Sequence, residues 1–221
     1  NVIRLGELYA KLAADPRLPE GERREFAGRV RECFNAAAER KPESRRLARS
    51  AARFYAAQSD RAQAVPEGLA LLNRHIEACP ALERAAARVL KARFLENTGD
   101  ATAAEAELLA LEKELPSLAT EPESLKRAEQ DLAVELVDFY SRVRQAEKLV
   151  AACRKALTRT ESAALRQRLQ LQAIEGLLGL QEFGRAREEL DAYQKESPED
   201  ANGMRLRVSL ILDEPQPSPE K

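Results

Sequence analysis

The stretch that decides the fold is residues 186–198, which read AREELDAYQKESP. Ala186, Leu190 and Tyr193 are spaced four and three residues apart, so they lie on one face of a helix. Pro198 then ends that helix, because proline has no backbone N–H and its ring clashes with the preceding turn. The stretch therefore predicts an amphipathic helix that is stopped by a proline.

The same arrangement recurs earlier in the chain, where a small or aliphatic residue precedes a larger apolar one by four positions. The earlier pairs are Val30 and Phe34, Gly68 and Leu72, Ala104 and Leu108, and Ala146 and Val150. Successive copies lie 38, 36, 42 and 40 residues apart. A proline follows twelve residues after the small residue in every copy except the fourth, where Thr158 takes its place. Periods of this length are typical of a repeated two-helix unit.

Each unit contains two helical patterns, so we expect five pairs of helices. The first helices are predicted at about 1–14, 44–58, 82–97, 123–141 and 162–180, and the second helices at about 19–40, 65–78, 101–115, 144–158 and 184–196. Residues 15–19 and 60–63 are interpreted as insertions between helices.

Local signals mark some of the helix ends. Gly99 and Asp100 are expected to form a left-handed helix end followed by an acidic helix start. Thr120 and Glu123 have the spacing of a capping box. Both signals support a break between two helices at these points.

The last part of the chain is open to two interpretations. Met204, Leu206, Val208, Leu210 and Leu212 alternate as in a strand, yet a lone strand would leave its backbone groups without partners. We therefore favour a terminal helix that covers the end of a helical stack. The predicted domains are a helical-repeat domain over 1–212 and a Pro-rich flexible tail over 213–221.

Composition limits the class of protein. Of 221 residues, 44% are apolar, 33% are charged and 5% are aromatic. The apolar runs are far shorter than the roughly 20 residues of a membrane-spanning helix, so no membrane span is expected. Residues 1–80 carry 15 basic and 11 acidic side chains. Because the two charges are interleaved and stacking aromatics are few, nucleic-acid binding is the weaker reading. The prediction is an all-α protein.

Catalytic side chains are few. The chain has one histidine, His75, and three cysteines that lie far apart, Cys33, Cys79 and Cys153. We interpret His75 as packed between helices and the cysteines as reduced thiols of the core, which favours the cytoplasm. No enzyme activity, cofactor or metal is expected.

Because Val2 already belongs to a helical pattern, we expect residue 1 to be a boundary inside a longer protein.

The repeats resemble the tetratricopeptide repeat (TPR) family. Its signature is approached in the first unit by Val2, Leu5, Gly6 and Tyr9. The third unit is similar in Ala92, Leu95, Gly99, Asp100, Ala104, Leu108 and Pro116, and the fifth in Phe183, Ala186, Leu190, Tyr193 and Pro198. Five degenerate repeats cover about residues 1–198. The resemblance implies a right-handed α-solenoid of stacked antiparallel helix pairs.

The resemblance also implies a binding surface, because first helices line the concave groove of such proteins. The inward positions carried over by register are Arg46, Arg49, Arg53, Arg93, Asn97, Asp131, Glu135, Asp138 and Glu175. This set predicts a groove that is basic at one end and acidic at the other. The expected function is a non-catalytic scaffold that binds a partner protein or peptide. The alternative is a regulatory or localising segment of a larger enzyme or transcription regulator.

Overall fold

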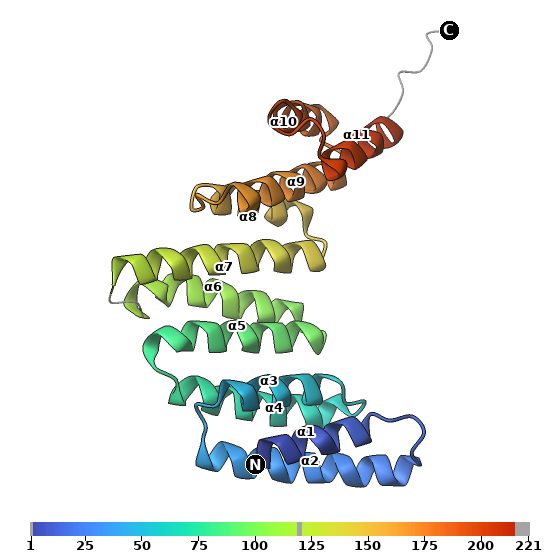
Figure 1. The fold of residues 1–221 in the computed structure, drawn as a ribbon, viewed down its shortest axis with the longest axis vertical. Helices are drawn as coiled ribbons and strands as arrows, with labels where there is room; N and C mark the ends of the chain where they lie inside the picture. Colours follow the sequence, from blue (N-terminus) through green and yellow to red (C-terminus); the bar gives the residue numbers. More distant parts are fainter. Residues whose placement is uncertain (1, 119–120, 215–221) are drawn as a thin grey trace. The chain divides into compact units, whose positions relative to one another are not determined.

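The structure is a computed structural model that describes residues 2–118 and 121–214. Within these ranges the chain forms eleven α-helices and no β-strand, which confirms the predicted all-α class (Figure 1). The helices divide into two compact units, residues 1–120 and residues 121–221. Each unit is described by itself.

Unit 1 contains six helices in three consecutive pairs. They are α1 (Val2–Ala13), α2 (Glu20–Arg40), α3 (Arg45–Ala56), α4 (Arg61–Ala78), α5 (Ala81–Asn97) and α6 (Ala101–Leu118). Each helix contacts the one that follows it, and the first helices also contact one another, α1 with α3 and α3 with α5. In Figure 1 the members of each pair lie side by side.

Unit 2 contains five helices. They are α7 (Pro122–Arg142), α8 (Ala146–Leu157), α9 (Ala163–Gly179), α10 (Phe183–Glu196) and α11 (Ala201–Asp213). Here too each helix contacts the next, and α9 also contacts α11. In both units the principal contacts therefore join helices that are no more than two places apart in the chain.

Most predicted helix ends agree with the structure to within a few residues, but two differ. The stretch 60–63 is not an insertion, because α4 starts at Arg61 and the Asp60 side chain caps it by accepting a hydrogen bond from the Gln63 N–H at 3.4 Å. Helix α6 does not stop before Pro116 but continues to Leu118. A proline so close to a helix end removes one hydrogen bond and has little helix left to disrupt.

Three hairpin turns have the same geometry. Gly99, Arg144 and Gln181 all have positive φ, at 93°, 56° and 60°. In each turn the next residue donates its N–H five residues back, as Asp100 does to the Leu95 carbonyl at 2.9 Å. This is the hydrogen bond of a Schellman helix end, so the prediction at Gly99 is confirmed. The predicted capping box falls on Thr120, which lies outside the described residues.

The repeated small and large residues are the centre of the packing. Val30, Phe34, Leu72, Ala104 and Leu108 are at most 1% exposed. The corresponding residues of α10, Ala186 and Leu190, are fully buried as well. In the fourth copy Val150 is buried at 5% exposure, whereas Ala146 is only partly buried, so four of the five copies bury both residues of the pair.

The described part of the chain ends with helix α11, as favoured from the sequence; Asp213, assigned to the tail, is its last residue, and the predicted tail from residue 215 on lies outside the described residues. Asp200 caps α11 by accepting a hydrogen bond from the Gly203 N–H at 2.7 Å. Leu206 and Leu210 are buried in a cluster that includes Tyr193 of α10. The alternating pattern of this segment is therefore helical, with one side packed on the preceding pair.

A glycine substitution tests the close packing of α4 on α5. A Cβ on Gly68 would lie 2.5 Å from Phe94 Cζ, whereas a Cβ on Gly28 in α2 would have no neighbour within 4 Å. Alanine favours a helix by about 1 kcal/mol over glycine, while overpacking costs about 1–3 kcal/mol. We expect Gly68→Ala to lower the urea midpoint and Gly28→Ala to raise it. If Gly68→Ala raised the urea midpoint as Gly28→Ala does, the close contact between Gly68 and Phe94 would be contradicted.

Candidate functional site

The three arginines of α3 that were predicted to line a groove are all exposed to solvent, but they have different neighbours. Arg46 pairs with Glu7 of α1, and its Nε lies 2.9 Å from Glu7 Oε1. The Ser50 hydroxyl donates to the same carboxylate at 2.8 Å. Within the described part of the chain, the exposed side chains of Arg49 and Arg53 have no acidic partner. Two of the three arginines are therefore available to another molecule.

The carboxylate of Glu7 is strongly influenced by these neighbours. Hydrogen bonding from Arg46, assisted by Ser50, lowers the pKa of Glu7 to about 2, although partial burial opposes this change. Glu7 therefore stays ionised at pH values where an ordinary glutamate takes up a proton. It fixes the side chain of Arg46 and links α1 to α3.

The remaining predicted residues of unit 1 lie on α5. Arg93 and Asn97 are both exposed, and they are one helical turn apart near the end of α5. Arg93 also has an interaction partner and is therefore not free. Because α5 contacts α3, the structure places both residues on the helix next to the arginines of α3.

The acidic residues predicted in unit 2 lie on α7 and α9, and most of them face a positive partner. Glu135 is only 6% exposed and lies 3.4 Å from Arg142 of the same helix. Asp138 pairs with Arg168, and Glu175 pairs with Arg205 at 2.6 Å. Asp131 is exposed. The negative charge of this set is therefore largely balanced by arginines.

These ion pairs follow a rule that was not predicted from the sequence. An acid on one first helix pairs with an arginine on the next first helix of the same unit. The pairs are Glu7 with Arg46, Asp138 with Arg168, and Glu175 with Arg205. Second helices are linked similarly by Arg31 with Glu67 and Arg154 with Glu189. In each pair the acid and the arginine are about one repeat length apart in the chain, and this regular spacing could have revealed the pairs from the sequence.

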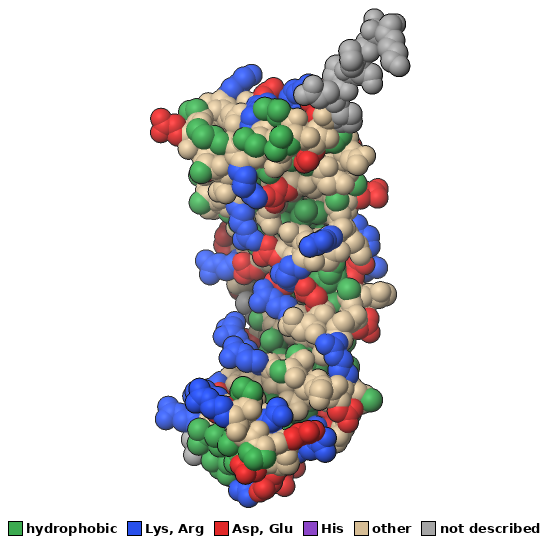
Figure 2. All heavy atoms as spheres, turned by 90° about the vertical axis from the view of Figure 1, so that its right-hand side faces the viewer, with side chains coloured by type: hydrophobic (Ala, Val, Ile, Leu, Met, Phe, Trp, Pro, Cys, Tyr) green, Lys and Arg blue, Asp and Glu red, His purple; other side chains and the backbone are tan. Residues whose placement is uncertain are grey.

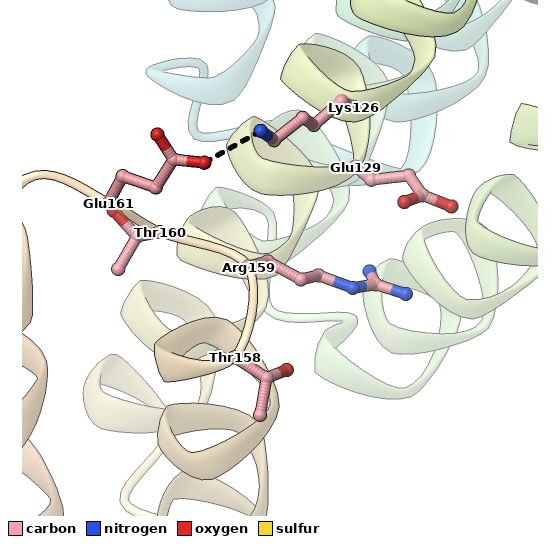
Figure 3. Close-up of a pocket in the computed structure, with 6 residues that line it drawn as sticks. All are labelled: Lys126, Glu129, Thr158, Arg159, Thr160 and Glu161. Carbon is pink, nitrogen blue, oxygen red and sulfur yellow. Dashed lines mark hydrogen bonds and ion pairs between the residues drawn. The ribbon is translucent and has the colours of Figure 1, made fainter.

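One hollow of about 220 Å³ lies in unit 2 between the start of α7 and the turn after α8 (Figure 3). Its lining is polar and comprises Lys126, Glu129, Thr158, Arg159, Thr160 and Glu161. Lys126 Nζ lies 2.8 Å from Glu161 Oε1, and this pair raises the pKa of Lys126 and lowers that of Glu161. Lys126 and Glu161 therefore balance one another's charge in the lining of the hollow.

The histidine has a packing role in the structure. His75 is 5% exposed, and its Nδ1–H donates to the carbonyl oxygen of Pro42 at 2.9 Å. The sulfur of Cys79 lies 3.6 Å from His75 Nε2. This contact connects α4 to the turn between α2 and α3, which agrees with the interpretation of His75 as packed between helices.

The cysteines are all free thiols with restricted access. Cys79 and Cys153 are buried and Cys33 is partly buried. Burial raises the pKa of all three, and that of Cys153 reaches about 12. Since the thiolate is the reactive form, this environment is the opposite of one that activates a nucleophile.

Two further absences apply to the described residues. No cluster of three or more His, Cys, Asp or Glu side chains has the geometry to hold a metal ion. Among the helices of residues 2–118 and 121–214, none is both long enough and apolar enough to cross a membrane.

The pKa of Glu7 predicts an acid-dependent loss of stability. A carboxyl whose pKa falls from 4.5 to about 2 on folding stabilises the protein above pH 4.5, and this stabilisation is lost as the pH falls toward 2. Because Arg46 is half exposed, we expect at most about 1 kcal/mol. Urea unfolding of Glu7→Gln should show a smaller stability difference between pH 6 and pH 3 than the unaltered protein. An identical pH dependence would contradict this role.

The thiol environments predict an order of alkylation. In the folded protein at mildly alkaline pH, iodoacetamide should modify Cys33 faster than Cys79 or Cys153, because only Cys33 is partly accessible. Peptide mass spectrometry over time measures the three rates separately. In urea the three rates should converge, and rapid labelling of Cys153 in the folded protein would show that the helix pair around it opens readily.

Comparison with known proteins yields no relative from which a function could be transferred. No protein-family model matches the chain, and no curated protein matches it. The function must therefore be argued from the geometry of the two units.

Proposed function

We propose that this chain is a non-catalytic protein-interaction scaffold of TPR-like helix pairs, which binds an acidic segment of a partner protein through α3. The observation that carries the proposal is the contrast among the arginines on first helices. Arg46, Arg168 and Arg205 are held by carboxylates of a neighbouring helix. Arg49 and Arg53, by contrast, have no acidic partner among the described residues.

The spacing of Arg49 and Arg53 suits such a ligand. Residues four positions apart on a helix lie on the same face, so both guanidinium groups can contact one extended or helical segment. Each guanidinium can donate two parallel hydrogen bonds to a carboxylate. Such charge pairs set the register and speed of association more than the total affinity. The partner expected here is a segment with two acidic side chains.

The repeat organisation supports the scaffold part of the proposal. The principal contacts join helices close in the chain, three hairpins share one turn geometry, and ion pairs link equivalent helices. In arrays of this kind each repeat contacts only its neighbours, which leaves one side of every first helix available for binding. The polar hollow, the buried His75 and the high thiol pKa values favour a binding role over catalysis.

Charge reversal on α3 tests the proposal. Arg49→Glu/Arg53→Glu should weaken binding of a fluorescein-labelled acidic peptide, such as one of eight glutamates, by at least about tenfold, which corresponds to about 1.4 kcal/mol. Binding by the unaltered protein should also fall with added salt, because the charges are exposed. Fluorescence anisotropy measures both effects.

A matched control separates this site from overall charge. Arg40 of α2 and Arg74 of α4 are also exposed, they lie outside α3, and neither has an acidic partner among the described residues. Arg40→Glu/Arg74→Glu changes the net charge by the same amount and leaves α3 unaltered, so binding should be largely retained. Circular dichroism checks that both variants keep their helices. Equal loss in the two double variants, or none in either, would reject the α3 site.

A further inference from the structure

The outer side of α11 carries an apolar stripe. Met204, Val208, Ile211 and Leu212 are 49%, 55%, 60% and 76% exposed. Their spacing of four, three and one residues puts them on one side of the helix. Figure 2 shows hydrophobic side chains gathered on the surface of the part of unit 2 that carries α11. Terminal helices of repeat arrays usually turn a polar face outward.

The stripe matches a buried face elsewhere in the same unit. Val208 and Ile211 lie 34 positions after Ile174 and Leu177 of α9, and the C-cap Glu214 lies 34 positions after the C-cap Leu180. Ile174 and Leu177 are at most 1% exposed. They share a buried cluster with Ala186 and Leu190 of α10.

The other side of α11 also follows the pattern of α9. Leu206 and Leu210 pack into the cluster formed with α10, and a Cβ on Gly203 would lie 3.0 Å from Tyr193 Cε1. In α9, a Cβ on Gly176 would similarly lie 2.7 Å from Val150 of the preceding α8. Both helices thus pack one side on the preceding second helix. In α9 the remaining apolar side is covered by α10, and in α11 it is exposed.

The printed sequence directly after α11 does not have the pattern of the second helix of such a pair. Three residues separate the helices in the pairs α5–α6, α7–α8 and α9–α10. A second helix joined by such a turn would begin near residue 217, where the sequence reads Pro215-Gln216-Pro217-Ser218-Pro219. Alternate prolines are an unfavourable pattern for a helix, because proline lacks a backbone N–H and its ring clashes with the preceding turn.

We propose that the apolar stripe of α11 binds an amphipathic helix of a partner protein, which takes the place that α10 takes on α9. The partner helix has a small residue followed four positions later by a large apolar one, as in Ala186 and Leu190. The small residue lets the two helix backbones approach, and the large one fills the space beside Val208 and Ile211. This surface belongs to unit 2, whereas the arginines of α3 belong to unit 1.

A copy of α10 is the natural probe. A labelled peptide with the sequence of residues 183–197, stapled on its polar side to hold it helical, should bind the full chain in a saturable manner. Val208→Asp/Ile211→Asp should weaken binding at least about tenfold. The matched control is Leu8→Asp/Leu109→Asp, because both are exposed leucines outside α11, with 53% and 38% exposure, and the double change adds the same charge. A peptide with Leu in place of Ala186 should lose binding by steric conflict.

Three outcomes would overturn the proposal. The first is absence of saturable binding by the stapled peptide, and the second is equal binding by the unaltered chain and Val208→Asp/Ile211→Asp. The third comes from sedimentation velocity without peptide, which should show a monomer. Self-association that is removed by Val208→Asp/Ile211→Asp would assign the stripe to a second copy of the chain instead.

Discussion

The structure depends on one repeated contact, in which two helices approach closely because one presents a small residue where the other presents a large one. Gly68 beside Phe94 is the tightest example, since a Cβ added to the glycine would lie only 2.5 Å from the ring. Gly6 beside Phe34 repeats it in the first pair, at 2.6 Å. Such contacts bury large side chains with little tolerance for added volume. The helices of each unit therefore pack in one register.

Electrostatic links are added to this apolar framework. Because most are exposed to solvent, each adds little to the free energy of folding. The ion pair between Arg88 and Glu107 differs from the others because it is largely shielded from solvent, with both side chains less than 15% exposed. Lys91 Nζ also contacts the Glu107 carboxylate at 3.0 Å. Burial favours the neutral acid, yet the two cations keep the pKa of Glu107 below its usual value. Figure 2 shows the resulting mixture of basic and acidic side chains on the surface.

The helices could be predicted well from the sequence because their signals are local. Helical periodicity, the prolines after α2, α4 and α10, and the glycine at position 99 all act within a few residues. The end of α6 was predicted wrongly from Pro116, because a proline's effect depends on how much helix follows it. Asp60 was missed because a cap and an insertion look alike in a single sequence.

The candidate site was less predictable, for a physical reason. Periodicity shows which side of a helix a residue occupies, but not which side chain of another helix reaches it. Arg46 and Arg49 look equivalent on α3, yet only Arg46 meets Glu7. In the same way, the sequence does not show that Glu175 has a partner, whereas the structure pairs it with Arg205. The difference between a bound and an available charge required the packing of one helix on the next.

The three-residue turns between paired helices have a consequence for how the chain folds. A short connection closes its hairpin with little loss of chain entropy, so each pair can form from residues that are near neighbours. Arg144 and Gln181 hold left-handed conformations without being glycine, and the surrounding hairpins must compensate for that strain. Folding can therefore begin at several pairs independently. Among the described helices, α11 contacts only α9 and α10, so we expect it to join last and to exchange its amide protons first.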